Sequence, residues 1–321
     1  MPISLKDAKV GMANKVDQNV IDEFRRASYL LDQLIFDNAV SPGTNGSTMT
    51  YGYLRLKTPG AVEFRNLNEE YTPKESVKES ATADIKIFGG AFEIDRMIED
   101  TSGQVSETAF QLSEKIKAAS ALFHNTVING DSSKNTKSFD GLKKILEGTD
   151  TEYKPGTAID LSTTELTQTN ANLFVETLDD FLSMLDGKPS MLLCNSKMKN
   201  KLKAVARNLG YYSRVEDAFG RTIDAYDNIP IIDAGEYYNG STTEMNVPIE
   251  EDGTTAIYAV TIGLDGFHGI SPKGDKIIKT YLPDFKAPGA VKRGEVEMAA
   301  AVVLKNSKKA GVLRNIKIKT P

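Results

Sequence analysis

A long one-sided helix between Gln104 and Ile128 is the feature that most constrains this chain. Apolar residues recur there every three or four positions, which is the spacing of one helix face, and charged side chains lie off that stripe. A helix over this range would span about 37 Å at 1.5 Å per residue. Thr101 with Gln104 matches an N-terminal capping box, and Asn129-Gly130 is typical of a C-terminal stop. The sequence therefore predicts one long helix with a single packing face.

The segment Lys57–Ser80 is too polar to form a core of its own. It contains two prolines and many charged residues. Its branched aliphatic and phenyl side chains are Val62, Phe64, Leu67 and Val77. The flanking residues 48–56 and 84–95 have the composition and alternation of strands. A long excursion that cannot bury itself is either mobile or bound to another surface.

The remaining elements are shorter. An amphipathic helix is predicted from Asp17 to Phe36 and is followed by turn-rich residues 38–46. Helices at 173–185 and 197–209 flank a short apolar strand at 190–194, and this order indicates an α/β layer. Further strands are predicted at residues 229–232, 256–262, 276–282, 291–304 and 312–318.

Charge balance and cysteine content exclude several classes of protein. The 321 residues include 44 acidic and 39 basic side chains, so no basic field indicates a nucleic-acid-binding domain. The single cysteine, Cys194, excludes intramolecular disulfides and thiol-rich metal sites. The first twenty residues lack a signal-peptide core, and no later window is an uninterrupted apolar span, which predicts a soluble protein made in the cytoplasm. The cations of residues 305–319 fit either nonspecific contact with phosphates or a role in solubility.

The sequence contains no arrangement suited to catalysis. A nucleophile needs a nearby base, and the only imidazoles are His124, in the predicted long helix, and His268, in a predicted turn. Cys194 ends an apolar strand, which favours a small core residue. Residues Gly269–Lys276 lack the Lys-[Ser/Thr] pair of a phosphate loop, so we predict a turn there. We expect no enzyme, no cofactor and no metal, with a carboxylate-dependent enzyme as the alternative of another class.

The order of these elements resembles that of the major capsid proteins of tailed bacteriophages, which have the Hong Kong-type capsid fold. The resemblance covers nearly the whole chain. Asn129–Leu146 is similar to the family's Asn-Gly-Asp turn followed by Phe-x-Gly-Leu, and Ser190–Arg207 is similar to its strand-to-helix step. Tyr226–Gly235 resembles the later segment with Gly-x-Pro-[Ile/Val], with Asn228 in place of the usual glycine.

The resemblance implies an α+β fold, the tailed-phage capsid fold, with an N-terminal arm, an extended loop, a long spine helix, a peripheral domain and an axial domain. The implied divisions are an N-terminal arm at 1–47, an extended-loop hairpin at 48–95 with its tip at 57–80, a peripheral domain with the spine helix at 96–149, an axial domain at 150–285, and strands completing both domains at 286–321.

The implied function is self-assembly into the icosahedral head shell of a tailed bacteriophage around its double-stranded DNA. The resemblance implies a homo-oligomer of pentamers and hexamers, made in the host cytoplasm and located in the virion, with no membrane. A separate scaffolding protein, a portal, decoration proteins and nonspecific contact with packaged DNA are the other expected partners. The alternative within this architecture is an encapsulin-type shell that encloses cargo protein.

We expect the extended loop to lie over an adjacent subunit and the arm helix to be buried against a neighbour. Mixed charges in the loop favour reversible, salt-sensitive docking. The segment Asp265–Lys276 is a candidate for the symmetry axis of the capsomer. The candidate inter-subunit contacts are Phe24, Leu31, Glu63, Arg65, Glu69, Glu70, Lys74 and Lys78.

Overall fold

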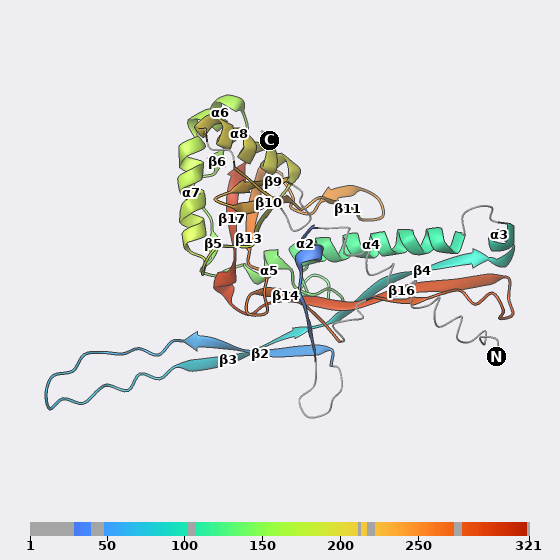
Figure 1. Ribbon diagram of the computed structural model, residues 1–321, viewed down its shortest axis with the longest axis horizontal. Helices are drawn as coiled ribbons and strands as arrows, with labels where there is room; N and C mark the ends of the chain where they lie inside the picture. Colours follow the sequence, from blue (N-terminus) through green and yellow to red (C-terminus); the bar gives the residue numbers. More distant parts are fainter. Residues whose placement is uncertain are drawn as a thin grey trace.

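The protein combines two packed layers with a hairpin that projects away from both (Figure 1). A computed structural model describes residues 29–39, 48–101, 107–210, 213–216, 222–272 and 278–319. In Figure 1, helix α4 lies along strands β4 and β16, and helices α6, α7 and α8 lie beside a second sheet. The hairpin of β2 and β3 projects to the left in this view, whereas β4 runs to the right.

The first layer consists of a long helix packed on a five-stranded sheet. The sheet comprises β1 (Phe36–Asn38), β4 (Lys86–Asp95), β14 (Phe267–Ser271), β15 (Ile278–Tyr281) and β16 (Val291–Leu304). Strand β16 is central, because it pairs antiparallel with β4, β14 and β15. Burial alternates along its first ten residues, so the apolar face is covered while the other face stays more accessible. Helix α3 (Arg96–Thr101) follows β4.

Helix α4 spans Glu107–Asn129 and confirms the predicted long helix within the described residues. The predicted cap at Gln104 lies outside them. The helix ends where predicted, because the chain turns back closely at Gly130 and Gly141, which are joined by a backbone hydrogen bond of 2.9 Å. A Cβ atom on Gly130 would lie 2.3 Å from the Phe139 carbonyl oxygen, so only glycine fits this turn.

The second layer is an eight-stranded sheet with helices on one face. Its strands are β5 (Glu152–Tyr153), β6 (Ile159–Asp160), β7 (Met191–Cys194), β8 (Ser213–Glu216), β9 (Thr222–Tyr226), β10 (Ile229–Asp233), β13 (Thr254–Val260) and β17 (Ala310–Lys317). The helices are α6 (Thr164–Thr169), α7 (Ala171–Ser183) and α8 (Ser196–Leu209). The short α5 (Leu142–Ile145) contributes to the core of the first layer. The 3-10 helix η1 (Ser307–Lys309) precedes β17, and β11 (Glu236–Tyr238) pairs with β12 (Thr243–Met245) in a separate hairpin.

Strand β7 and helix α8 form where predicted, and each begins within one residue of the predicted start and ends at the predicted residue. The Asn195 side chain accepts a hydrogen bond from the Met198 backbone N–H at 2.8 Å, which caps the helix. Gly210 ends it with a positive φ of 76°. Strand β16 occupies the residues predicted for it, and α7, β10, β13, β15 and β17 agree with their predictions to within a few residues.

The predicted helix from Asp17 to Phe36 is wrong at its C-terminal end. The described part is the short helix α2 (Tyr29–Gln33), and Phe36–Asn38 then pairs as a parallel strand with β14. Residues 17–28 lie outside the described residues. The Phe36 ring lies over Gly269, where a Cβ atom would approach it to 2.5 Å. Sheet pairing and this ring contact therefore override the helical spacing.

The predicted turn at Gly269–Lys276 is also wrong over its first residues. Phe267–Ser271 forms β14, a strand that is buried along its whole length, so His268 lies in a sheet. Because β14 and β15 both pair with β16, the predicted second domain does not continue as one unit to residue 285. The same pairing places the described part of Asp265–Lys276 within the first layer, and we withdraw this segment as a candidate for the axis.

We expect the first layer to be most sensitive to substitution in the aromatic cluster around Phe123 of α4. Phe123 is fully buried and contacts the rings of Phe36, Phe88 and Phe139, with centroids 6.2, 5.6 and 5.7 Å away. We expect Phe123→Ala to lower the free energy of unfolding by about 3–5 kcal/mol, as for other buried phenylalanines. Urea denaturation of unassembled subunits measures this. The control Leu173→Ala, at a half-exposed position, should change it by less than about 1 kcal/mol.

Candidate functional site

The most unusual surface of the protein is the projecting hairpin. Strands β2 (Thr50–Thr58) and β3 (Val77–Asp84) pair antiparallel, with an irregularity in register between Leu56 and Thr58. Residues 59–76 between them contain no helix or strand. The predicted strand at 48–56 corresponds to β2, and the predicted strand at 84–95 corresponds to β4, which pairs with β16 instead of β2. The partner of β2 is β3, which begins within the predicted excursion.

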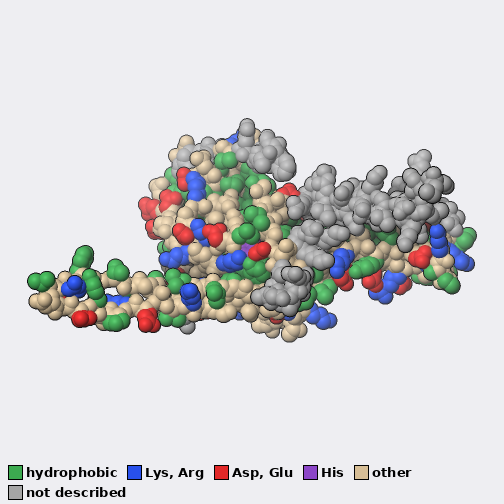
Figure 2. Space-filling model, turned by 60° about the horizontal axis from the view of Figure 1, so that its bottom comes forward, with side chains coloured by type: hydrophobic (Ala, Val, Ile, Leu, Met, Phe, Trp, Pro, Cys, Tyr) green, Lys and Arg blue, Asp and Glu red, His purple; other side chains and the backbone are tan. Residues whose placement is uncertain are grey.

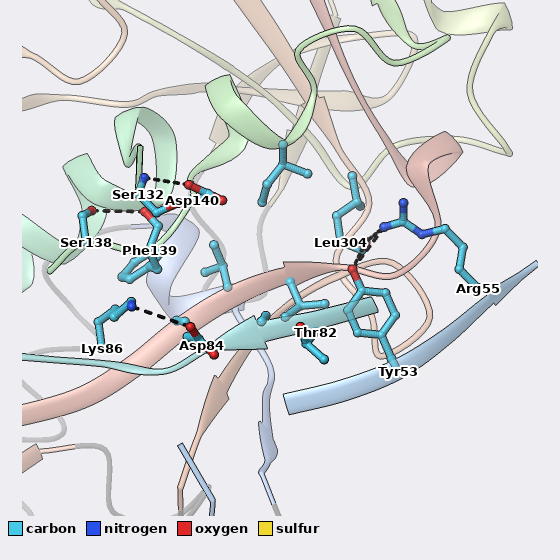
Figure 3. A pocket seen from close by; sticks show the side chains of 15 residues that line it. Tyr53, Arg55, Thr82, Asp84, Lys86, Ser132, Ser138, Phe139, Asp140 and Leu304 are labelled. Carbon is cyan, nitrogen blue, oxygen red and sulfur yellow. Dashed lines mark hydrogen bonds and ion pairs between the residues drawn. The ribbon is translucent and has the colours of Figure 1, made fainter. Parts of the chain in front are cut away.

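The base of the hairpin is fixed to the first layer by polar contacts. The Tyr51 hydroxyl donates a hydrogen bond to Asp37 Oδ2 at 2.6 Å, and Lys305 Nζ lies 3.9 Å from the same carboxylate. Arg55 Nη2 and the Tyr53 hydroxyl donate to the Leu304 carbonyl at 3.1 and 3.5 Å. Figure 3 shows both side chains reaching Leu304 across a hollow that is lined on its other side by Ser132, Ser138 and Asp140.

The proton positions in the Tyr51–Asp37 contact are well defined. Burial favours a raised pKa for Asp37, but the hydrogen bonds from Tyr51 and the Asn38 N–H outweigh it, so the pKa of this carboxyl is lowered. Burial and the neighbouring carboxylate raise the pKa of Tyr51. Tyr51 therefore remains the donor and Asp37 the charged acceptor over the whole neutral range.

The charged residues at the hairpin tip bind one another. Lys74 Nζ lies 2.8 Å from Glu63 Oε2, and the Thr72 N–H donates to Glu63 Oε1 at 2.8 Å. The Lys74 hydrogen bond lowers the pKa of Glu63. Arg65 Nη1 donates to the Glu69 carbonyl, and Glu69 Oε2 accepts from the Asn66 backbone and side chain. The Arg65 guanidinium also lies 5.3 Å from the centre of the Tyr71 ring.

The apolar residues of the tip point into solvent instead. Val62 is 99% exposed, Leu67 is 89% exposed, and the Phe64 side chain is completely exposed. Figure 2 shows hydrophobic side chains standing out along the hairpin. Leu54, Leu56 and Val77 extend this accessible apolar surface onto the strands. A contiguous set of exposed apolar side chains is typical of a surface that another molecule covers.

The structure divides the predicted contact residues into four groups. Glu63, Arg65, Glu69 and Lys74 hold the shape of the tip within one chain. Glu70 and Lys78 are exposed on the same hairpin. Leu31 is buried in the first layer, so it stabilises its own chain and we withdraw it from the contact set. Phe24 lies outside the described residues.

Three basic residues near the C-terminus lie beside acidic residues. Lys309 Nζ lies 3.4 Å from Asp186 Oδ2, and Arg314 Nε lies 2.5 Å from Glu152 Oε1. Lys305 neighbours Asp37, as described above. These acidic partners come from distant parts of the sequence, which is why the local charge run overstated the positive field.

The groups considered for catalysis are buried. Cys194 has no exposed surface, and burial raises the pKa of its thiol to about 12, so the reactive thiolate is disfavoured. His268 is buried in β14, and burial lowers its pKa. Among the described residues, no group of three or more histidine, cysteine, aspartate or glutamate residues is suited to holding a metal ion. In the same part of the chain, no helix has the length and apolar character needed to cross a membrane.

Comparison with known proteins identifies the family. A model of the SU10 major capsid protein family matches residues 35–232, which is more than half of the chain. This chain belongs to the SU10 major capsid protein family. No curated protein matches it.

Solved structures share the fold of this capsid protein. The SrpI encapsulin of Synechococcus elongatus aligns with a TM-score of 0.62 and 14% identity, over 90% of this chain and 87% of that chain. The capsid of a native GTA particle aligns at 0.57 and 14%, over 90% of both chains. The capsid of the Myoviridae phage XM1 aligns at 0.55 and 12%, over 90% and 91%. At these identities the likeness concerns the fold, and it confirms the predicted tailed-phage capsid fold.

The capsid protein is thus a structural component of a bacteriophage virion, and many copies assemble into its icosahedral shell. The sequence predicted the correct family, fold class and function. The charged tip residues stay predicted contacts, and Glu63, Arg65, Glu69 and Lys74 also bind within the tip of their own chain. Side chains that pair with each other nine or more residues apart, such as Glu63 and Lys74, give no local signal of that pairing.

The hairpin base provides a first test of these contacts. Tyr51→Phe removes the hydroxyl donor from the Asp37 carboxylate, and loss of such a bond costs about 1–2 kcal/mol. We expect amide hydrogens of Thr50–Leu56 to exchange roughly 5–30 times faster in this variant. The control Tyr53→Phe should change exchange little, because its own bond is longer and Arg55 still holds the Leu304 carbonyl. Equal effects of both variants would contradict this assignment.

Burial of His124 should make the stability of the subunit depend on pH. Burial lowers the pKa of His124 to about 4 from the ordinary 6.5, despite the opposing charge of Asp233. Because the folded state favours the neutral ring, this stabilisation is complete above pH 6.5 and is lost as the pH falls towards 4. Its size is on the order of 3 kcal/mol. Urea denaturation of unassembled subunits should show wild type losing stability relative to His124→Gln over this window, and parallel profiles would contradict the assignment.

Proposed function

We propose that the tip of the β2–β3 hairpin clasps an adjacent subunit, and that subunits joined in this way form the pentamers and hexamers of the shell. The observation that carries the proposal is the contrast within the tip, where charges bind each other and Val62, Phe64 and Leu67 face solvent. Burial of such side chains contributes about 1.5–3 kcal/mol each, so the clasp is apolar. This replaces the salt-sensitive docking expected from the sequence.

We assign domain roles to the two layers on this basis. The first layer, with α4 as its spine helix, is the peripheral domain, and residues 263–304 belong to it together with 85–149. The second layer, from about residue 150 to 262 with β17, is the axial domain that surrounds the capsomer axis. We keep residues 1–47 as the N-terminal arm, and its described part, which includes β1, packs into the first layer.

The shell encloses double-stranded DNA and acts without catalysis. The buried state of Cys194 and His268 supports a purely structural role. Subunits are made in the host cytoplasm and assemble with a separate scaffolding protein, a portal and decoration proteins. Contact with packaged DNA is nonspecific.

A cargo-enclosing shell is the second candidate. It is favoured by the TM-score of 0.62 with the SrpI encapsulin, which is higher than those with the two capsids above. The two candidates differ in particle content. Nuclease-treated particles from infected or lysogenic cells contain protected DNA if the shell is a phage head, and a second protein with no DNA if it encloses cargo.

Assembly tests the proposal directly. We expect the purified protein, alone or with a scaffolding protein, to form closed shells or capsomer rings in negative-stain electron microscopy. Val62→Ser, Phe64→Ser and Leu67→Ser together should raise the protein concentration needed for assembly at least tenfold, because a tenfold change corresponds to about 1.4 kcal/mol. Circular dichroism should show an unchanged subunit, because these side chains contact solvent.

A matched variant changes exposed charges of the same hairpin. Glu70→Gln with Lys78→Gln leaves the contacts between Glu63 and Lys74 intact and should assemble within about threefold of the wild-type concentration. Dissolution of shells by this variant, with normal assembly of the serine variant, would overturn the apolar clasp. Persistent monomers of the wild-type protein under all conditions would overturn the shell itself.

A further inference from the structure

An apolar groove lies between helix α4 and the edge of the first layer. Its apolar lining is formed by Ile87, Phe88, Leu122, Phe123 and Phe139, and its polar lining by Lys86, Thr126, Asn135, Lys137 and Ser138. Its volume is about 200 Å³. Ile87 on β4 and Leu122 on α4 are both exposed at its mouth, although both are large aliphatic residues. The groove therefore presents apolar surface that its own chain leaves uncovered.

The floor of the groove is a fixed aromatic surface. The rings of Phe88 and Phe123 are stacked with an interplanar angle of 5°, and Phe139 packs against Phe123 at 55°. Phe123 has no exposed surface, so this arrangement is held by the core. A groove with such a floor is largely formed before any occupant arrives.

The position and charge of the groove indicate its occupant. The tip of the hairpin lies well away from α4 in Figure 1, so a tip that reaches the groove must come from a second copy. Lys86 and Lys137 line the groove, and Lys86 lies 3.8 Å from Asp84 of its own chain. At the tip, Glu63 is paired with Lys74, whereas Glu70 is exposed, as Lys137 is at the groove. An exposed glutamate on the tip and an exposed lysine at the groove are complementary in charge.

We propose that this groove receives the Phe64 side chain of a second copy. The inference rests on the proposed apolar clasp and specifies where the clasp closes. Cavities of about 150 Å³ lined by apolar side chains accommodate a benzene ring, so a phenyl group fits the available volume. Phenyl rings also gain from offset or edge contacts with other rings, which the half-buried Phe88 ring offers. Val62 and Leu67 then cover the rim at Ile87 and Leu122.

Thiol cross-linking tests this pairing in assembled particles. Cys194 is fully buried, so the wild-type background is low. Phe64→Cys combined with Leu122→Cys should yield covalent dimers and higher oligomers after treatment with a short bismaleimide, measured by denaturing electrophoresis. The matched control combines Phe64→Cys with Leu173→Cys on α7, since Leu173 is 53% exposed against 38% for Leu122. We expect the groove pair to cross-link at least tenfold more than the control pair.

Several outcomes would overturn the inference. Particles that form normally without cross-linking of the groove pair would place Phe64 elsewhere and leave the shell function standing. Equal cross-linking of the control pair would show no preference for the groove. Oligomers from Leu122→Cys alone would mean that two grooves face each other and that the occupant is not the tip. Wild-type protein that never assembles would instead count against the proposed function.

A stability measurement covers the case in which the cysteine variants assemble poorly. Leu122→Asp places a charge in the mouth of the groove, and Leu173→Asp places the same charge on exposed α7. We expect shells of the first variant to dissociate at a clearly lower temperature, or to require at least tenfold more protein, while unassembled subunits of both variants have similar unfolding profiles. Indistinguishable shells from the two variants would overturn the inference.

Discussion

The structure depends on one sheet that is buried on both faces. In β7, Met191 and Leu193 belong to the core of the first layer, while Leu192 and Cys194 belong to the core beneath α7 and α8. Strands β10, β13 and β17 are divided in the same way. Because adjacent residues of a strand face opposite sides, one ladder of hydrogen bonds ties together two hydrophobic cores. The two layers therefore cannot rotate against each other without opening the core that they share.

The direction of the hairpin follows from this shared sheet. The Leu304 carbonyl, which accepts from Arg55 and Tyr53, ends β16, and the chain continues through η1 directly into β17. The hairpin base is thus bonded to the connection between the two layers. In a closed shell, the angle at which each clasp leaves its subunit has to repeat, and here it is set at the most constrained point of the fold.

Sequence periodicity was sufficient to locate elements that pack through a single apolar face. Helix α4 and strand β16 each have one apolar face, so spacing alone located them. It failed where a tertiary contact decides the conformation, as at Phe36, whose ring covers Gly269 and joins β1 to β14. It failed again at β14, because a strand with two glycines nearby resembles a turn until its partners are known. The pairing of Glu63 with Lys74 gave no signal for the same reason, since the two residues lie across the loop from each other.

The division between paired charges and exposed apolar groups fits the demands of building a shell. Internal pairs such as Glu63 with Lys74 fix the shape of the tip before contact, so less conformational entropy is lost when it docks. Each apolar side chain then contributes only about 1.5–3 kcal/mol. A single clasp of this strength opens readily, and a misplaced subunit can leave. In a closed shell built with the proposed clasp, every subunit would both give and receive one, so loss of a subunit would require breaking several contacts at once, and stability would arise from closure.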